Sequence, residues 1–271
     1  MKNYSKTKST ILSLLGIFAI TLTSCNEDLG MGPEVPQYST ENYNTDALNS
    51  EAQQIDVYNL PYEELADLEV ASLIFMREEE KLARDIYIEF FEIYPDAQIF
   101  SRISDSEQKH MDAVLALLDK YGIEDPVVDE GAIGIFANTD LQSLYNSLLS
   151  QGEESLIEAL TVGATIEEID IIDLMALLEN TVDNEDITLV YSNLLKGSRN
   201  HLRMFVQNLS VNGVTYEPTY LDVTLFDSII SSDMEKGLMK QEKRQDGNTG
   251  KGVHNGNNGN NGNGGGNGGG N

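Results

Sequence analysis

Hydrophobic residues recur at alternating spacings of three and four along four long segments of the chain, the spacing typical of amphipathic helices. In the segment that ends at Gly122, one such face consists of Phe100, Ile103, Glu107, His110, Val114, Leu117 and Tyr121. The same period is found between Pro61 and a break at Tyr94, over about 153–179 and over about 185–209. The pattern therefore predicts four long helices, each with one face in a core.

The connections between these segments differ in length. Short breaks separate the first helix from the second and the third from the fourth, whereas a long connection joins the second to the third. In that connection Gly131 and Gly134 indicate loop, and Thr139-Asp-Leu-Gln142 resembles a capping box that opens a short helix to about Leu149. Two helical hairpins joined by a long crossover with a short helix are the ferritin-like arrangement. We therefore expect an all-α, ferritin-like four-helix bundle.

Several positions on the apolar faces are polar, which is unusual for a core. They are Glu80, Glu107, His110, Glu167, Asp170, Ser198 and His201. Burying an ionised group without a partner costs several kcal/mol, and Glu-x-x-His on an inward helix face places both side chains on one cation. Four carboxylates and two imidazoles suit two transition-metal ions, which would also relieve the repulsion among the carboxylates. The predicted metal ligands are Glu80, Glu107, His110, Glu167, Asp170 and His201.

Each of these residues also has an explanation without metal. Glu107 and His110 alone would form a hydrogen-bonded core pair or a surface salt bridge, and Glu80 would pair with Arg84 one turn later. His201 alone would be a satisfied core histidine, and Tyr87 a core residue whose hydroxyl meets a carboxylate. Arg77, Glu78, Glu79 and Lys81 would form a solvated charged face. The coincidence of polar groups in phase on four helices favours metal binding over a metal-free polar core.

Composition narrows the class of protein. The chain has 271 residues, 40% of them hydrophobic, which is enough for one core. Its formal net charge of −28 repels nucleic acid, so a nucleic-acid partner is not expected. The single cysteine excludes a disulfide framework or a Cys-x-x-Cys metal site within the chain.

The N-terminal segment explains that cysteine. Lysines precede an apolar run from Ile11 to Ile20, and Leu22-Thr-Ser-Cys25 follows it, which resembles a bacterial lipoprotein signal. The run is too short for a mature membrane-spanning helix. An ordinary secretory signal with an unrelated cysteine is the alternative. The resemblance implies removal of residues 1–24, lipidation of Cys25 and a membrane partner, at the outer membrane on its periplasmic side or at the cell surface.

Composition shifts mark the domain boundaries. Residues 25–58 are polar and aperiodic, which predicts a flexible stalk, and residues 59–236 hold the predicted helices, including a final short one between Leu221 and Lys236. Residues 237–271 become almost wholly glycine and asparagine, which predicts a disordered tail.

Short motifs resemble a known superfamily. Glu80, followed by Ala83, Arg84 and Tyr87, resembles the first-helix motif of the rubrerythrin and ferritin group, and Glu107-Gln-Lys-His110 the second-helix motif. More narrowly, the segments 76–84, 106–112 and 197–203 together resemble the ferritin-like family called domain of unknown function 2202. The resemblance covers about residues 60–236. It implies a ferritin-like bundle and di-iron chemistry, without an assigned activity for the narrow family.

One position departs from the superfamily pattern. Di-iron members carry Glu-x-x-His on the fourth helix, whereas this chain has Ser198, a poor ligand, before His201. Asp170 would compensate from the third helix, where Glu168 is an alternative to Glu167 if that helix is rotated. Ser198 also favours a rival hypothesis, a metal-free or degenerate ferritin-like binding or structural module tethered to the cell envelope.

The leading hypothesis is a lipoprotein with a carboxylate-bridged centre of two iron ions, or manganese as the second choice. Oxidoreductase chemistry toward oxygen, or iron and peroxide handling, is the associated activity. Because the chain lacks cysteines for a rubredoxin-like centre, turnover would need an external electron donor. Metal sequestration without redox turnover is a further alternative.

Overall fold

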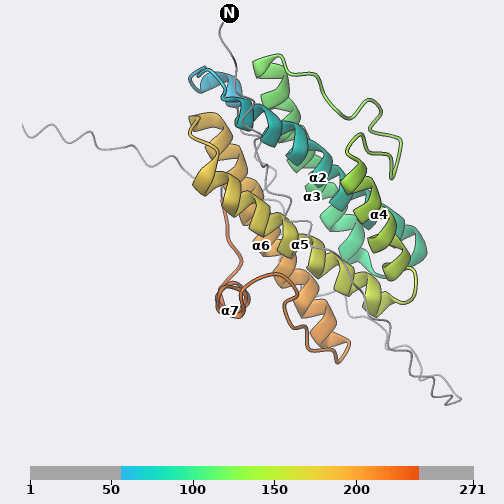
Figure 1. Ribbon diagram of the computed structural model, residues 1–271. Coiled ribbons are helices and arrows are strands. Elements are labelled where there is room, and N and C mark those ends of the chain that lie inside the picture. Colours follow the sequence, from blue (N-terminus) through green and yellow to red (C-terminus); the bar gives the residue numbers. More distant parts are fainter. Residues whose placement is uncertain (1–55, 238–271) are drawn as a thin grey trace, which may run out of the picture. The chain divides into compact units, whose positions relative to one another are not determined.

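The computed structural model describes residues 56–237, and this part of the chain is all-α. It contains a short 3₁₀ helix, η1 (Val57–Asn59), and six α-helices (Figure 1). These are α2 (Asp67–Ile93), α3 (Gln98–Tyr121), α4 (Thr139–Gly152), α5 (Leu156–Asn180), α6 (Glu185–Val211) and α7 (Val223–Ser231). None of the described helices is long and apolar enough to span a bilayer.

The four long helices form two hairpins, as the hydrophobic pattern predicts. α2 packs mainly against α3 and α5 against α6, and contacts of α3 with α6 and of α2 with α5 join the hairpins into a bundle. The short helix α4 lies in the crossover and packs on α5 and α2. The expectation of an all-α bundle with a long crossover is therefore confirmed.

Helix ends follow local capping chemistry, with shifts from the predicted bounds. α3 ends at Gly122, whose φ of 67° is the left-handed conformation that favours glycine. The predicted capping box that starts at Thr139 is not formed, because the N-cap is Asn138, whose side chain accepts from the backbone N–H groups of Asp140 and Leu141. Gln142 instead donates to Gly134 O at 2.9 Å and so orders the preceding loop.

The first long helix begins at Asp67, later than the predicted start near Pro61. The reason is a lysine on α3: the ammonium of Lys120 donates to the carbonyl oxygens of Val57, Leu60 and Pro61 at 2.9–3.1 Å. These hydrogen bonds hold residues 57–61 against α3, in a path that does not continue α2. Val57 is buried, so the packed part of the chain begins two residues before the predicted domain boundary at 59.

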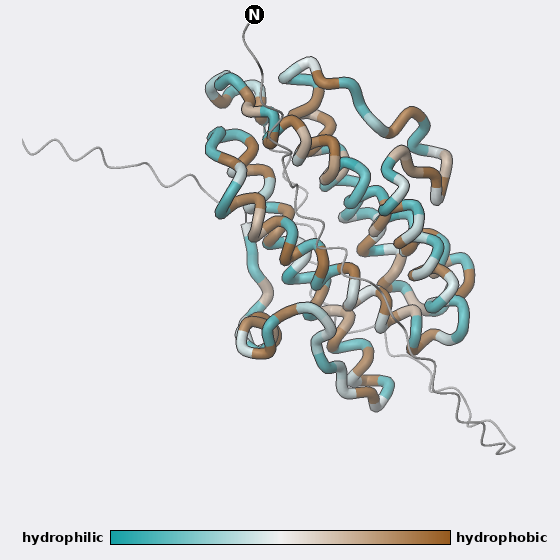
Figure 2. Tube along the Cα trace, viewed as in Figure 1, coloured by the Kyte–Doolittle hydropathy of each residue, from teal (hydrophilic) through white to brown (hydrophobic). Residues whose placement is uncertain are grey.

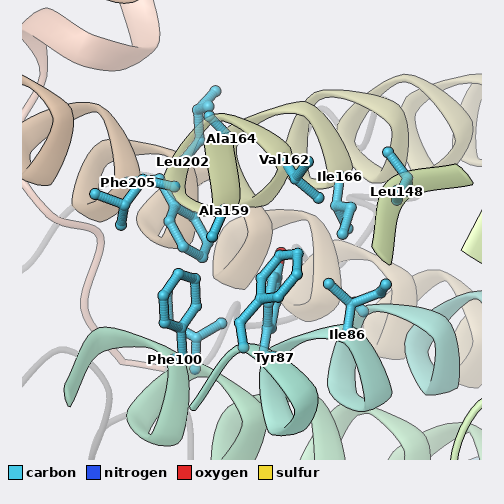
Figure 3. Close-up of a cluster of buried hydrophobic side chains, with 14 of the residues drawn as sticks. Ile86, Tyr87, Phe100, Leu148, Ala159, Val162, Ala164, Ile166, Leu202 and Phe205 are labelled. Carbon is cyan, nitrogen blue, oxygen red and sulfur yellow. The ribbon is translucent and has the colours of Figure 1, made fainter. Parts of the chain in front are cut away.

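The hydrophobic core is divided into two clusters along the bundle. One includes Tyr87, Phe100 and Phe205 (Figure 3). The other includes Leu73, Met76, Val114, Leu174 and Tyr191. Apart from Ile171 on α5, the residues of one cluster precede, and those of the other follow, the polar positions predicted as ligands on each long helix. Hydrophilic and hydrophobic residues alternate along the helices in Figure 2. A polar layer therefore interrupts the core between two apolar ends.

The charged positions before and after Glu80 are not a solvated face, and that prediction is wrong. Arg77, Glu78, Glu79 and Lys81 are each at most 7% exposed. Arg77 donates to both oxygens of Asp125 at 2.9–3.2 Å and to Glu130, in the connection before α4. These residues are buried because the crossover covers them.

Further contacts of α2 hold the same connection. Lys81 Nζ donates to Ala132 O at 2.8 Å and pairs with Asp85, and Glu78 accepts from the backbone N–H groups that precede α4, Asn138 N at 3.1 Å among them. A connection without regular secondary structure has many backbone groups to satisfy. The charges on α2 supply their partners and so fix the path of the crossover.

A buried carboxylate on α5 holds the segment that leads to α7. Glu168 accepts from Tyr216 Oη at 2.6 Å and from the backbone N–H groups of Thr219, Tyr220 and Leu221 at 2.6–3.0 Å. It is fully buried. Glu168 therefore faces the C-terminal segment, and the alternative in which it replaces Glu167 on the inward face is wrong.

Candidate metal centre

The polar layer brings together side chains from all four long helices. Glu80 comes from α2, Glu107 and His110 from α3, Glu167 and Asp170 from α5, and Ser198 and His201 from α6, and each is at most 7% exposed. The pairs on α3, α5 and α6 are three residues apart, which puts both members on one helix face. The helical spacing from which these polar residues were predicted therefore also places their side chains together in one layer of the bundle.

Glu107 lies between the two histidines. His110 Nδ1 is 2.7 Å from Glu107 Oε2, and His201 Nδ1 is 2.8 Å from Glu107 Oε1. Both imidazoles thus turn the same nitrogen toward one carboxylate, although they come from different helices. The rings lie 5.6 Å apart between centroids.

Two further carboxylates complete the arrangement. Glu80 Oε2 is 3.2 Å from His110 Nδ1, and Glu167 Oε2 is 3.5 Å from His201 Nδ1. Two buried triads result, Glu80–Glu107–His110 and Glu107–Glu167–His201, and within each triad one donor atom per residue lies within 4.8 Å of the others. Glu107 is common to both, so five of the six predicted ligands form two adjacent groups that share a carboxylate.

Asp170, the sixth predicted ligand, accepts a hydrogen bond from Ser198, the residue whose missing carboxylate it was expected to replace. Ser198 forms a short hydrogen bond with Asp170 Oδ2 and also lies 2.8 Å from Leu194 O. Asp170 belongs to neither triad. Its other oxygen, Oδ1, is buried without a hydrogen-bond partner.

Neighbouring groups fix the orientation of the candidate ligands. Tyr87 donates to Glu167 Oε1 at 2.6 Å, which confirms the prediction of a core tyrosine whose hydroxyl meets a carboxylate. His201 Nε2 lies 3.0 Å from Ser106 Oγ. A hydrogen bond at Nε2 leaves Nδ1 as the nitrogen available to a cation, which is the usual role of such a partner in metal sites.

A glycine on α6 makes room for His110. A Cβ atom at Gly197 would lie 2.6 Å from the Cε1 and Nε2 atoms of the His110 ring, closer than van der Waals contact allows. Sequence reasoning missed this residue, as it missed Ser106. The available signals were a glycine inside a helical pattern, one residue before Ser198, and a serine directly before Glu107.

Arg84 does not pair with Glu80, which removes the metal-free explanation considered for that carboxylate. Arg84 donates to Asp85 at 2.7 Å, to Gln108 Oε1 at 2.6 Å and to Glu130 O at 2.7 Å. Glu80 Oε1 is buried without a hydrogen-bond partner. A buried unpaired carboxylate oxygen is costly, and a cation would supply the missing partner.

The electrostatics of the layer are those of excess buried acid. Burial raises the pKa of Glu80 to about 7 although His110 acts in the opposite direction, and burial together with the charge of Glu107 raises the pKa of Glu167 to about 7. Burial would lower the pKa values of His110 and His201, but Glu107 outweighs it and raises both well above 6.5.

The pKa of Glu107 shifts in the opposite direction. Burial acts to raise its pKa, but His201 and His110 outweigh burial and hold it below its ordinary value of 4.5. Without a cation, the layer therefore relies on protons to balance its carboxylates.

A small cavity lies next to the triads. Its volume is about 10 Å³, close to the space that one water molecule requires. Acidic side chains and apolar side chains of α2, α4 and α5 border it: Glu79, Glu80, Leu82, Ala83, Glu107, Leu141, Leu144, Ile166, Glu167, Ile169 and Asp170.

The residues present fit a pair of transition-metal ions. Carboxylates and imidazoles are the donors that iron and manganese accept. Among the predicted ligands the buried oxygens Glu80 Oε1, Glu107 Oε1 and Asp170 Oδ1 lack hydrogen-bond partners, and Gly197 leaves the space that His110 occupies. The predicted lipidation site Cys25 and the signal peptide 1–24 lie outside the described residues, as do most of the predicted stalk and tail.

Comparison with known proteins identifies relatives of this part of the chain. The family model described as "Uncharacterized protein domain (DUF2202)" matches residues 69–233. The uncharacterized protein MJ0754 of Methanocaldococcus jannaschii is 48% identical over 182 residues, which cover 67% of this chain and 97% of that protein.

A solved structure is also similar. The crystal structure of the hypothetical protein MJ0754 from Methanococcus jannaschii superimposes with a TM-score of 0.63 at 48% identity, covering 65% of this chain and 99% of that chain. The matched residues 69–233 include all four long helices, apart from the first two residues of α2, and every residue of both triads. The chain therefore belongs to the family of the uncharacterized protein domain DUF2202.

Proposed function

We propose that the polar layer binds two transition-metal ions, iron first and manganese as the second choice, in a carboxylate-bridged centre of ferritin-like type. The supporting observation is the position of Glu107, whose two oxygens lie 2.7 Å and 2.8 Å from histidines of two different helices. A carboxylate shared by two donor groups is the arrangement that bridges two cations. The connectivity of two hairpins and a crossover supports the ferritin-like comparison.

In this proposal each residue would have a defined task. Glu107 would be shared by the two ions, Glu80 and His110 would hold one of them, and Glu167 and His201 would hold the other. Tyr87 keeps Glu167 in position through its 2.6 Å hydrogen bond, and Ser106 orients the His201 ring. Partners of this kind raise the affinity of a metal site because the ligands need not be reorganised on binding.

A bound iron pair would supply electron exchange with oxygen or peroxide. The chain's own contribution is a dry, apolar enclosure on both sides of the layer and fixed donors within it. Electrons would come from an external donor, because a single cysteine cannot build a rubredoxin-like centre. Lipidation of Cys25 would hold the domain at the cell envelope, with the membrane as its partner.

A second candidate is a metal-free or degenerate module with the same fold. The hydrogen bond between Ser198 and Asp170 favours it, because the fourth helix lacks a carboxylate and the third-helix carboxylate already has a partner. In this case the layer would be a proton-balanced polar core, and the protein would serve as a tethered binding or structural module. A third reading is metal sequestration without redox turnover.

Metal loading under anaerobic conditions tests these alternatives. The full chain is stripped with a chelator, exposed to ferrous iron, freed of unbound metal and analysed by elemental mass spectrometry. We expect about two ions per chain, with loss of both in the Glu107→Ala, His110→Ala double variant, because the bridge and one terminal ligand are removed together.

The matched control is Asp105→Asn, which removes an exposed carboxylate from the same helix. It should retain the metal content of the wild-type chain. Iron-free protein after loading, with stability unchanged by iron, would refute the metal centre and support the degenerate module. Bound iron without consumption of oxygen or peroxide in the presence of a reductant would support sequestration.

A further inference from the structure

The two triads are buried, so any ion that occupies them must pass between side chains. The cavity beside them is bordered by Glu107 and Glu167 of the triads and also by Glu79 and Asp170. Leu141 and Leu144 of the crossover helix α4 border it as well. The cavity is thus lined both by candidate ligands and by residues at the junction of α2, α4 and α5.

A second pair of carboxyl groups lies at this junction. Glu79 of α2 lies close enough to Asp173 of α5 for their charges to interact, and Asp173 is only half-buried. Asp173 lies one helical turn after Asp170 on the same helix, so the three residues extend from the outside toward the cavity. Neither Glu79 nor Asp173 takes part in the triads.

Two oxygen atoms of this group have unused hydrogen-bonding capacity. Glu79 and Asp170 are each 7% exposed, and Glu79 Oε2 and Asp170 Oδ1 are buried without a hydrogen-bond partner. Both residues border the cavity. Unpaired buried acceptors attract a cation or a proton donor because the alternative is an uncompensated loss of hydration.

We infer that Glu79 and Asp173 form the outer station of a route by which divalent metal cations enter the buried centre beneath α4. The half-buried Asp173 captures the hydrated ion, Glu79 takes it inward, and Asp170 passes it toward Glu80 and Glu107. This inference rests on the proposed metal centre and adds the path by which that centre is filled.

The position of Glu79 distinguishes this role from those of its neighbours. Arg77, Glu78 and Lys81 are all engaged in holding the crossover, whereas the charged neighbours of Glu79 include the acids Asp173 and Asp170. Paired acids are an unfavourable way to fill a core, but they lower the barrier for a passing cation.

Cobalt(II) uptake by the metal-stripped full chain tests the inference. Stopped-flow mixing follows the visible absorption that cobalt gains on binding imidazole and carboxylate ligands. In the Glu79→Gln, Asp173→Asn double variant we expect uptake to be slower by about tenfold, because local acidic fields raise association rates by roughly 10 to 10³. The final absorption should equal that of the wild-type chain, since no ligand is removed.

The matched control is the Glu92→Gln, Glu179→Gln double variant. It removes the same charge from the same two helices at exposed positions that do not border the cavity. Its uptake rate should stay within about twofold of wild type, because exposed charges are screened beyond about 10 Å at ordinary salt. Raising the salt concentration should slow the wild type more than the Glu79→Gln, Asp173→Asn variant.

Each outcome decides the inference. An unchanged rate in the Glu79→Gln, Asp173→Asn variant overturns the route, and so does a reduced final absorption, which would make these residues ligands. If that variant fails to fold, judged by its circular dichroism, the single Asp173→Asn change at a half-exposed position must still slow uptake. A wild-type chain that binds no cobalt overturns both the route and the metal centre.

Discussion

The clearest test of the buried acidic layer is the pH dependence of stability with and without metal. We expect the metal-free protein to lose stability as the pH rises from 4.5 to 7, which is opposite to the usual behaviour of paired carboxylates. With metal bound, we expect stability to rise over the same range. The perturbation requires no mutation, so both arms use the same folded chain.

The magnitude follows from Glu80 and Glu167. Burial acts on both, and each pKa is raised from 4.5 to about 7. A carboxyl group whose folded-state pKa is raised stabilises the fold fully below its unfolded pKa and loses that contribution as the pH rises through its folded pKa. Each pKa unit corresponds to about 1.4 kcal/mol, so each group accounts for a loss of about 3 kcal/mol.

Other buried groups also contribute to the pH dependence of stability. The pKa of Glu107 is lowered by its two histidines, so its contribution is present above 4.5 and is lost only at more acidic pH. The pKa values of His110 and His201 are raised well above 6.5 by Glu107, so their contribution begins to fall above 6.5 and is lost as the pH rises through the raised values. Burial raises the pKa values of Glu79 and Asp170 well above their ordinary values, which adds a loss of stability of the same sign. Between pH 4.5 and 7 the metal-free protein therefore loses stability through Glu80 and Glu167 together with these neighbouring acids.

Metal binding reverses the direction in which stability changes with pH. Ionised carboxylates and neutral imidazoles are the ligand forms, so protons compete with the metal and its affinity rises with pH. A metal at one hundred times its dissociation constant stabilises the folded state by about 2.7 kcal/mol. The difference in stability between the loaded and the stripped protein should therefore widen steadily from pH 5 to pH 8.

Urea unfolding measures both arms. Circular dichroism is followed at several pH values from 5 to 8, once with a chelator and once with manganese(II), which does not oxidise in air as readily as iron. The Glu80→Gln, Glu167→Gln variant should show a shallower downward slope, because two of the buried acids no longer titrate. A metal-free stability that is constant or rises between pH 5 and 7 would refute the assignment of these two groups as strained buried acids.

Three substitutions make further predictions. Gly197→Ala should destabilise the fold by about 1–3 kcal/mol, measured by urea unfolding, because the added methyl group overpacks against His110. Metal titration should show affinity weakened about 10- to 100-fold. An unchanged affinity would show that the position of the His110 ring is not critical for metal binding. Glu168→Ala should lower the unfolding free energy by about 1–3 kcal/mol or more, because several buried donors lose their acceptor, and it should leave the metal content unchanged. Glu167→Ala should lower the metal content. Equal effects of the two substitutions on metal content would contradict the different faces assigned to these residues. Arg77→Met should lower the unfolding free energy by about 2 kcal/mol, which is less than for a fully enclosed ion pair because the partners of Arg77 are partly exposed. Limited proteolysis should then cleave the crossover. A crossover as resistant to protease as in the wild type would show that other contacts hold it in place.

The sequence by itself predicted the four long helices and which side chains share a face on each of them. This succeeded because the helical period relates positions along one chain segment, without any knowledge of the neighbours. Glu107 and His110, three residues apart in an apolar stripe, therefore pointed to a buried polar layer. The long crossover and its short helix followed from loop signals such as Gly134 in the same way.

Only the tertiary structure decided what covers each face. Arg77 and Lys81 look like surface charges in sequence, and they are buried because a distant connection lies over them. The choice between Glu167 and Glu168 depended on the rotation of α5 against its neighbours, which periodicity leaves uncertain by about one residue. The bond of Ser198 to Asp170 joins two helices, and no local pattern encodes it. Periodicity specifies directions within a helix, whereas burial and partnership arise from the packing of segments far apart in the chain.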